Sequence, residues 1–122
     1  HCNDTTDTEY LQWILDQGCF IGLDRYPGNG VSPHMRTVTL KKLMDMGYSD
    51  QLCPSHDCIC IHIHKELPDG TIPDEHQFQK ANPDQFLYMH RHVIPELKEM
   101  GVSEADIENL FVNNPRRFLF GE

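Results

Sequence analysis

Long apolar runs and basic residues are both scarce in this 122-residue sequence. No run approaches the roughly 20 apolar residues of a membrane-spanning helix. Ten Lys and Arg stand against 19 Asp and Glu, which gives a formal net charge of −9 at pH 7. Surfaces that bind nucleic acids or anionic membranes need clustered basic residues. We therefore expect neither nucleic acid nor membrane among the partners of this protein.

Cysteines are too few and too irregular for a disulfide-stapled scaffold. The count is odd, and no Cys-x-x-Cys pair occurs among Cys2, Cys19, Cys53, Cys58 and Cys60. Small secreted domains usually carry a denser, even set. We expect reduced thiols and a cytoplasmic location. The sequence opens without a methionine or a visible signal peptide, and we expect it to continue a longer chain.

The first half alternates between two kinds of pattern. Leu11, Ile14 and Leu15 share one face of a helix predicted over residues 8–17,. The nearly continuous apolar run 19–23 then predicts a buried strand. A second helix is expected over residues 33–46 and a second strand over residues 51–55. Alternation of this kind indicates βα units on a parallel sheet.

The second half begins with a long irregular connection. Residues 58–84 contain three prolines and a glycine, and connections of this length are usually functional loops,. Helices are predicted over 85–100 and 103–113. A terminal turn over 114–120 should dock its apolar side chains on the core, namely Phe118, Leu119 and Phe120.

The two predicted strands need more sheet than the sequence contains. Two strands do not form a stable sheet by themselves. Their continuously apolar character indicates that both faces are covered. A missing N-terminal part of the protein is the simplest source of the other strands.

Four segments together resemble one known family. They are residues 1–4, 21–27, 47–57 and the stretch from Val93 to Phe118. In this order and spacing they are similar to the C-terminal part of the phosphotriesterase family, in the amidohydrolase superfamily. The resemblance covers essentially the whole sequence.

The resemblance implies a (β/α)8 TIM barrel with a two-metal centre at its C-terminal face. Residues 1–122 would hold the end of strand six, strands seven and eight, and their helices. A complete barrel takes about 250 residues. The sequence would then be the C-terminal part of one barrel domain, incomplete by itself, with residues 58–84 as a substrate lid. We expect the isolated chain to be inactive.

The resemblance also implies roles for three residues. Asp57 matches a strand-eight aspartate that ligates the more buried metal and accepts a proton from the metal-bridging hydroxide,. His1 matches a strand-six histidine that ligates the more exposed metal, and Asp4 matches an acid that relays the proton. Plainer interpretations stay open: a loop carboxylate for Asp57, an arbitrary terminal residue for His1, and a helix N-cap for Asp4.

Three further residues would lie around the substrate. Arg25 stands where some family members carry histidine, and its context is similar to the lactonase-like branch; it would orient a leaving group or hold the relay acid,. Tyr26 would lie nearby as a pocket wall. Cys58 follows Asp57, where some members place an aromatic residue, and this departure leaves the substrate class open. An ordinary surface arginine is the alternative for Arg25.

The function implied is metal-dependent hydrolysis. A metal-activated hydroxide would attack a lactone and, promiscuously, a phosphotriester, so the partner is a small ester, lactone or organophosphate. Two divalent metal ions are expected, with zinc first and iron, cobalt or manganese as alternatives. The family resemblance also implies a homodimer.

Two alternatives compete with this function. One is a small zinc-binding interaction module, and the other is a non-catalytic family member. The module would use Cys53, Cys58, Cys60, His62 and His64, whose side chains suit zinc although their spacing is wrong for the familiar zinc fingers,. His62-Ile63-His64 also copies the superfamily's His-x-His ligand pair, but that pair belongs near the N-terminus of the barrel. The polar face of an extended loop is the simpler interpretation.

Overall fold

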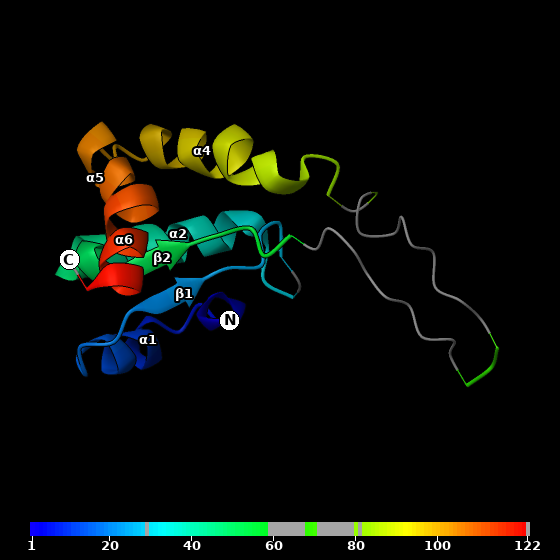
Figure 1. Ribbon diagram of the computed structural model, residues 1–122, viewed down its shortest axis with the longest axis horizontal. Helices are drawn as coiled ribbons and strands as arrows, with labels where there is room; N and C mark the ends of the chain where they lie inside the picture. The colour runs from blue at the N-terminus through cyan, green and yellow to red at the C-terminus, as the bar shows by residue number, and fades with distance from the viewer. Residues whose placement is uncertain (29, 59–67, 71–79, 81, 122) are drawn as a thin grey trace.

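The computed structural model describes residues 1–28, 30–58, 68–70, 80 and 82–121. At its centre two short parallel strands lie side by side, β1 (Ile21–Leu23) and β2 (Leu52–Pro54) (Figure 1). Ile21 pairs with Leu52, and Leu23 pairs with Pro54. The predicted parallel pairing is confirmed, and both strands are shorter than the apolar runs that predicted them.

The two helices of the first half begin at capping residues. In α1 (Thr8–Leu15) the Asp7 carboxylate accepts from the backbone N–H groups of Glu9 and Tyr10. In α2 (Pro33–Leu43) the Ser32 hydroxyl accepts from the N–H of Met35. These side chains satisfy donors that the first helical turn leaves unpaired. A wide turn, Met44–Tyr48, then ends α2 at Gly47, whose φ is 97°.

Proline interrupts both helical stretches of the second half. A 3₁₀ turn (Gln85–Leu87) and a π-helical turn (Met89–Val93) precede α4 (Ile94–Glu99). After α5 (Glu104–Glu108), a second π-helical turn (Asn109–Asn113) precedes α6 (Asn114–Phe120). Pro95 and Pro115 each lack the N–H that would continue a regular helix, so the preceding turn widens.

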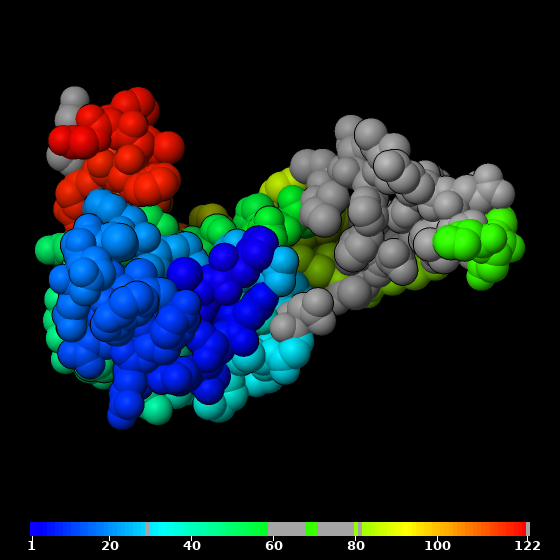
Figure 2. All heavy atoms as spheres, turned by 90° about the horizontal axis from the view of Figure 1, so that it is seen from below, coloured from blue at the N-terminus to red at the C-terminus, as the bar shows by residue number. Residues whose placement is uncertain are grey.

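The predicted terminal turn is instead helix α6, and its aromatic end does not dock on the core. Phe118, Leu119 and Phe120 are 63%, 68% and 72% exposed. In the space-filling view this end of the chain stands out from the body (Figure 2). The Phe118 ring contacts the Phe20 ring, with centroids 5.7 Å apart. The expectation of docking is therefore wrong for these three side chains.

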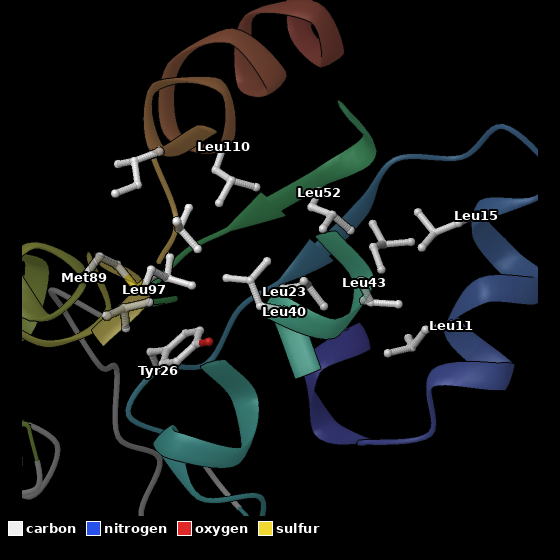
Figure 3. Close-up of a cluster of buried hydrophobic side chains, with 14 residues drawn as sticks. Leu11, Leu15, Leu23, Tyr26, Leu40, Leu43, Leu52, Met89, Leu97 and Leu110 are labelled. Atoms are coloured by element: carbon white, nitrogen blue, oxygen red, sulfur yellow. The ribbon is translucent and has the colours of Figure 1, made fainter. Parts of the chain in front are cut away.

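The hydrophobic core lies between the strand pair and the helices (Figure 3). Leu23 and Leu52 come from the strands, and both are completely buried. They share one buried cluster with side chains of α1, α2, α4 and α5, among them Leu11, Leu15, Leu40, Leu43, Leu97 and Ile107. Burial of one such leucine contributes about 2 kcal/mol to stability. This core fixes the strands, whose carboxyl ends lie beside the N-terminal segment (Figure 1).

A buried asparagine joins two of the segments that carry the family resemblance. The side-chain amide of Asn114 donates to the carbonyls of Ser49 and Leu52, at 2.6 and 2.7 Å. Arg117 donates to Asp50 Oδ1 at 3.1 Å. The Asn-Pro-Arg-Arg stretch therefore holds α6 against the beginning of β2, which gives a structural reason for the two motifs to occur together.

No helix among the described residues is long and apolar enough to cross a membrane.

Candidate metal centre

The candidate site lies where the two strands end. Asp24 and Arg25 directly follow β1, and Asp57 comes three residues after β2. Arg25 and Asp57 have positive φ values, 64° and 49°. Residues other than glycine adopt this left-handed conformation at a cost, and such positions cluster at functional sites. The carboxyl ends of parallel strands are also where α/β folds place their binding groups.

Three side chains with metal-binding atoms converge at these ends. His1 Nδ1 lies 2.6 Å from Asp24 Oδ2 and 3.8 Å from Asp57 Oδ2. One ligand atom from each residue falls within a cluster no wider than 4.8 Å. His1 comes from the N-terminal end, so the site joins three separate segments. The structure thus brings His1 and Asp57 together, as the resemblance implies.

The donor set fits a divalent cation. One imidazole and two carboxylates suit zinc, iron or manganese. Asp24 Oδ1 is buried and has no hydrogen-bond partner among the described residues. A carboxylate oxygen that is removed from water without a donor is costly, and a bound cation would compensate it. The unsatisfied oxygen therefore favours a metal at this cluster.

Asp24 was missed in the sequence analysis. The residue directly follows a predicted strand, which is the same signal that singled out Asp57. The sequence assigned a site role to its neighbour Arg25 instead, because arginine in that context resembles the lactonase-like branch. Position after a strand could therefore have identified Asp24.

Asp4 is held by two arginines. Its Oδ2 accepts from Arg25 at 2.6 Å, and its Oδ1 accepts from Arg36 at 2.9 Å. The hydrogen bond from Arg36, followed by that from Arg25, lowers the pKa of the Asp4 carboxyl despite partial desolvation,. The Arg25 Nε lies 3.8 Å from Asp57 Oδ2. Asp4 does not cap α1, since Asp7 has that role.

Tyr26 lies in the core, not on an accessible wall. The residue is 1% exposed, and its ring faces Tyr88 with centroids 6.3 Å apart. Burial raises the pKa of the phenol to about 12. The hydroxyl is near Thr37 and Asn3, yet it makes no hydrogen bond of normal geometry with a described residue. This placement does not suit direct contact with a substrate.

Cys58 is half-buried beside the candidate site. Its backbone N–H donates to His56 Nδ1 at 2.9 Å, which fixes the imidazole next to Asp57. Contact of Cys58 with a substrate stays a prediction. Of the other residues of the zinc-module alternative, Cys53 lies in β2. The remaining three lie outside the described residues, as does most of the expected lid 58–84: they are Cys60, His62 and His64.

An open hollow adjoins this cluster on the side of the N-terminal segment. Its volume is 370 Å³, and its lining includes His1, Asp4 and Tyr10. The N-terminal segment lies at the surface on this side of the molecule (Figure 2). His1 and Asp57 are accessible from outside, with side chains 46% and 45% exposed, whereas the Asp24 side chain is 18% exposed.

Comparison with known proteins gives consistent matches over nearly the whole chain. The phosphotriesterase family model matches residues 1–119. An aryldialkylphosphatase from Saccharolobus solfataricus is 35% identical over 119 residues, which are 97% of this chain and 36% of that protein. A phospho-furanose lactonase from Mycoplasmopsis synoviae is 28% identical over 126 residues, covering 98% of this chain and 32% of that protein.

A solved structure agrees with the sequence matches. The phosphotriesterase from Mycobacterium tuberculosis superposes with a TM-score of 0.81 and 31% identity, over 98% of this chain and 35% of that one. Fold and site together define an α/β chain with side chains that could hold a metal ion at the ends of its strands. The chain belongs to the phosphotriesterase family. It spans about a third of the length of the curated relatives that it matches.

Proposed function

We propose that the complete protein is a metal-dependent hydrolase with lactones as its preferred substrates and phosphotriesters as secondary ones. Residues 1–122 would form the C-terminal part of its (β/α)8 barrel, from the end of strand six to strand eight, with residues 58–84 as a lid. The observation that carries the proposal is the convergence of His1, Asp24 and Asp57 at the ends of two neighbouring parallel strands.

His1, Asp24 and Asp57 would hold metal at this cluster. A divalent metal, when bound, polarises a substrate oxygen and lowers the pKa of water toward neutrality. Two metals would need further ligands, and the rest of the barrel would supply them. The buried, unpartnered Oδ1 of Asp24 supports a role for Asp24 as ligand or as the group that orients His1,.

Asp57 is our candidate for the general base. Its carboxylate is exposed and lies at the open end of the strand pair, where it can accept a proton from an attacking water,. Asp4 was expected to relay that proton. The lowered pKa of Asp4 and its two arginine partners make it a weak proton acceptor. We propose instead that Asp4 holds Arg25 in place.

Arg25 would orient the substrate. Its guanidinium lies between Asp4 and Asp57, with one nitrogen 3.8 Å from Asp57 Oδ2. A planar group with several donors suits the two oxygens of an ester or lactone and their developing charge. The presence of a protein named as a lactonase among the relatives supports lactones as the first substrate class.

Metal removal and restoration test this function in the complete protein. A chelator should abolish hydrolysis, and addition of zinc, cobalt or manganese should restore it. Lactones should be hydrolysed faster than a dialkyl aryl phosphate. Asp57→Asn should abolish turnover while the fold is retained, which would also argue against a non-catalytic family member. Full activity after chelation, or an active Asp57→Asn variant, would refute the proposal.

A further inference from the structure

The side chain of Arg36, in the first turns of α2, is completely buried, with 0% exposure. An arginine is almost never fully buried unless its charge and donors are paired. A helix that only needed to pack on a sheet would be served better by an apolar residue at this position. The burial of Arg36 therefore calls for a specific reason.

The hydrogen bonds of Arg36 connect the segments that carry the candidate metal ligands. Its first terminal nitrogen donates to the carbonyl of Asn3 at 2.7 Å and to that of Asp24 at 3.1 Å. The segment of Asn3 carries His1 and Asp4. One guanidinium thus fixes the N-terminal segment against the end of β1.

The second terminal nitrogen of Arg36 holds Asp4 itself. It donates to Asp4 Oδ1 at 2.9 Å, while the other carboxylate oxygen accepts from Arg25 at 2.6 Å. Arg25 in turn lies 3.8 Å from Asp57. Four groups of alternating charge therefore run from the interior of α2 to the end of β2. The Asp4 carboxylate has a fixed direction because one of its oxygens accepts from Arg36 and the other from Arg25.

The loop after β1 packs closely on the guanidinium of Arg36. A Cβ added at Gly28 would lie 2.6 Å from Arg36 Nε, so only glycine leaves room for the guanidinium there. The Nε also donates to the carbonyl of Val31 at 3.1 Å. Groups that are held in this way keep a neighbouring site in one geometry.

We propose that Arg36 is a positioning residue of the hydrolytic site, which acts through Asp4 to hold Arg25 in its orientation toward Asp57. The inference rests on the proposed function, since it assigns a task within that site. Arg36 is completely buried, so we do not expect it to touch the substrate itself. Of its hydrogen bonds, the one to the Asp4 side chain leads on to Arg25, so most of the loss of turnover on substitution should depend on Asp4.

A double-mutant cycle in the complete protein tests this inference. The variants are Arg36→Met, Asp4→Asn and the double variant, compared by kcat and KM on a lactone that the wild type hydrolyses. We expect Arg36→Met to lower kcat/KM by about 10-fold or more, as for other groups that orient a site. In the Asp4→Asn background the same substitution should change kcat/KM by less than about 3-fold.

Two controls separate positioning from general damage. Lys41 lies on the same helix and pairs with Asp45 at the surface, at 2.6 Å, and Lys41→Met should leave kcat/KM close to the wild-type value. Arg36→Lys keeps the charge and replaces Arg36→Met in the cycle if that variant does not fold. Because lysine lacks the planar set of donors, we expect kcat/KM of Arg36→Lys to lie between those of Arg36→Met and the wild type.

Equal losses from the Arg36 substitution in both backgrounds would overturn the inference, because they would show that Arg36 does not act through Asp4. A folded Arg36→Met variant with wild-type kcat/KM would overturn it as well. A wild-type protein without hydrolytic activity would instead refute the proposed function. The same three variants would then be compared by their free energies of unfolding. If the effects of the two single substitutions add up to that of the double variant, Arg36 and Asp4 are not coupled.

Discussion

The Nδ1 atom of His1 lies 2.6 Å from Oδ2 of Asp24, although 23 positions separate the two residues in the sequence. This contact fixes the direction of the imidazole at the open edge of the strand pair. Metal-binding histidines are commonly oriented by a carboxylate in this way. In the proposed site Asp24 would contribute to metal binding either as a ligand itself or by holding His1.

The first prediction concerns the charge of Asp24. Asp24→Asn keeps the size of the side chain and removes the negative charge beside His1. We expect the complete protein to bind zinc about 10- to 100-fold more weakly, because neither a ligand nor an orienting carboxylate remains. Competition for zinc with a chromophoric chelator measures this change without reference to activity.

Asp45→Asn is the matched control for this prediction. Asp45 is exposed and pairs with Lys41 at 2.6 Å on the surface of the wide turn after α2. Its substitution should leave zinc affinity unchanged. Equal zinc affinities of Asp24→Asn and wild type would exclude Asp24 from the metal centre.

The second prediction compares two glycines in the loop after β1. Gly28 and Gly30 both have positive φ, 110° and 85°, so alanine is strained at either position. Only at Gly28 would a Cβ meet close neighbours, namely Arg36 Nε at 2.6 Å and the Val31 carbonyl at 2.7 Å. We expect Gly28→Ala to reduce the free energy of unfolding by about 1–3 kcal/mol more than Gly30→Ala.

Urea unfolding of the two glycine variants measures this difference. Gly30 serves as the control because nothing lies within 4 Å of an added Cβ there. Similar losses in both variants would mean that the loop moves aside, and that Arg36 is not confined by Gly28.

Much of the local structure could be predicted from the sequence, because its signals are local. The apolar runs predicted both strands, and their alternation with helices predicted a parallel sheet. The structure confirms the parallel pairing and adds its register, in which Leu23 pairs with Pro54. Asp57 was identified by its position after a strand, and the structure places it beside His1. The metal roles of these two residues stay predictions, since they come from the family resemblance.

The features that escaped prediction depend on partners far away in the chain. Arg36 reads as one polar position on a helix, and only the folded structure places its guanidinium among carbonyls from two other segments. Phe118 and its neighbours read as core residues because they are apolar, yet in the structure they are exposed. Tyr26 was expected at a pocket wall for its place beside Arg25, and it packs inward. Hydrophobicity indicates that a side chain favours burial, but not what is present to cover it.

The third prediction concerns the contact between α6 and β2. Asn114 is completely buried, and its amide donates to the carbonyls of Ser49 and Leu52. Asn114→Ala would remove the donor to the Leu52 carbonyl and leave the Ser49 carbonyl only the longer bond from the Asn109 amide, at 3.4 Å. We expect the free energy of unfolding to fall by about 1–3 kcal/mol. Asn113→Ala is the control, because Asn113 is exposed and makes no capping hydrogen bond. Equal stabilities of the two variants would contradict this role.

The fourth prediction concerns alkaline stability and Tyr26. Burial raises the pKa of its phenol from 10.0 to about 12. A group with a raised pKa in the folded state contributes stability that is fully present below the unfolded pKa and is lost as pH rises toward the folded one. As pH rises, the phenol ionises in the unfolded chain before it ionises in the folded protein, and this stabilises the unfolded chain. The free energy of unfolding should therefore decrease between pH 10 and 12. At pH 11 the loss from this residue is about 1 kcal/mol.

Tyr26→Phe isolates the contribution of this phenol from those of other tyrosines and of the cysteines. Since the hydroxyl has no hydrogen-bond partner of normal geometry among the described residues, the substitution should cost little at pH 8,. Urea unfolding at pH 8 and pH 11 should show a smaller alkaline loss for Tyr26→Phe than for wild type. The same loss in both proteins would mean that Tyr26 ionises at its ordinary pKa and that solvent reaches the phenol through the core around Tyr88 and Leu97.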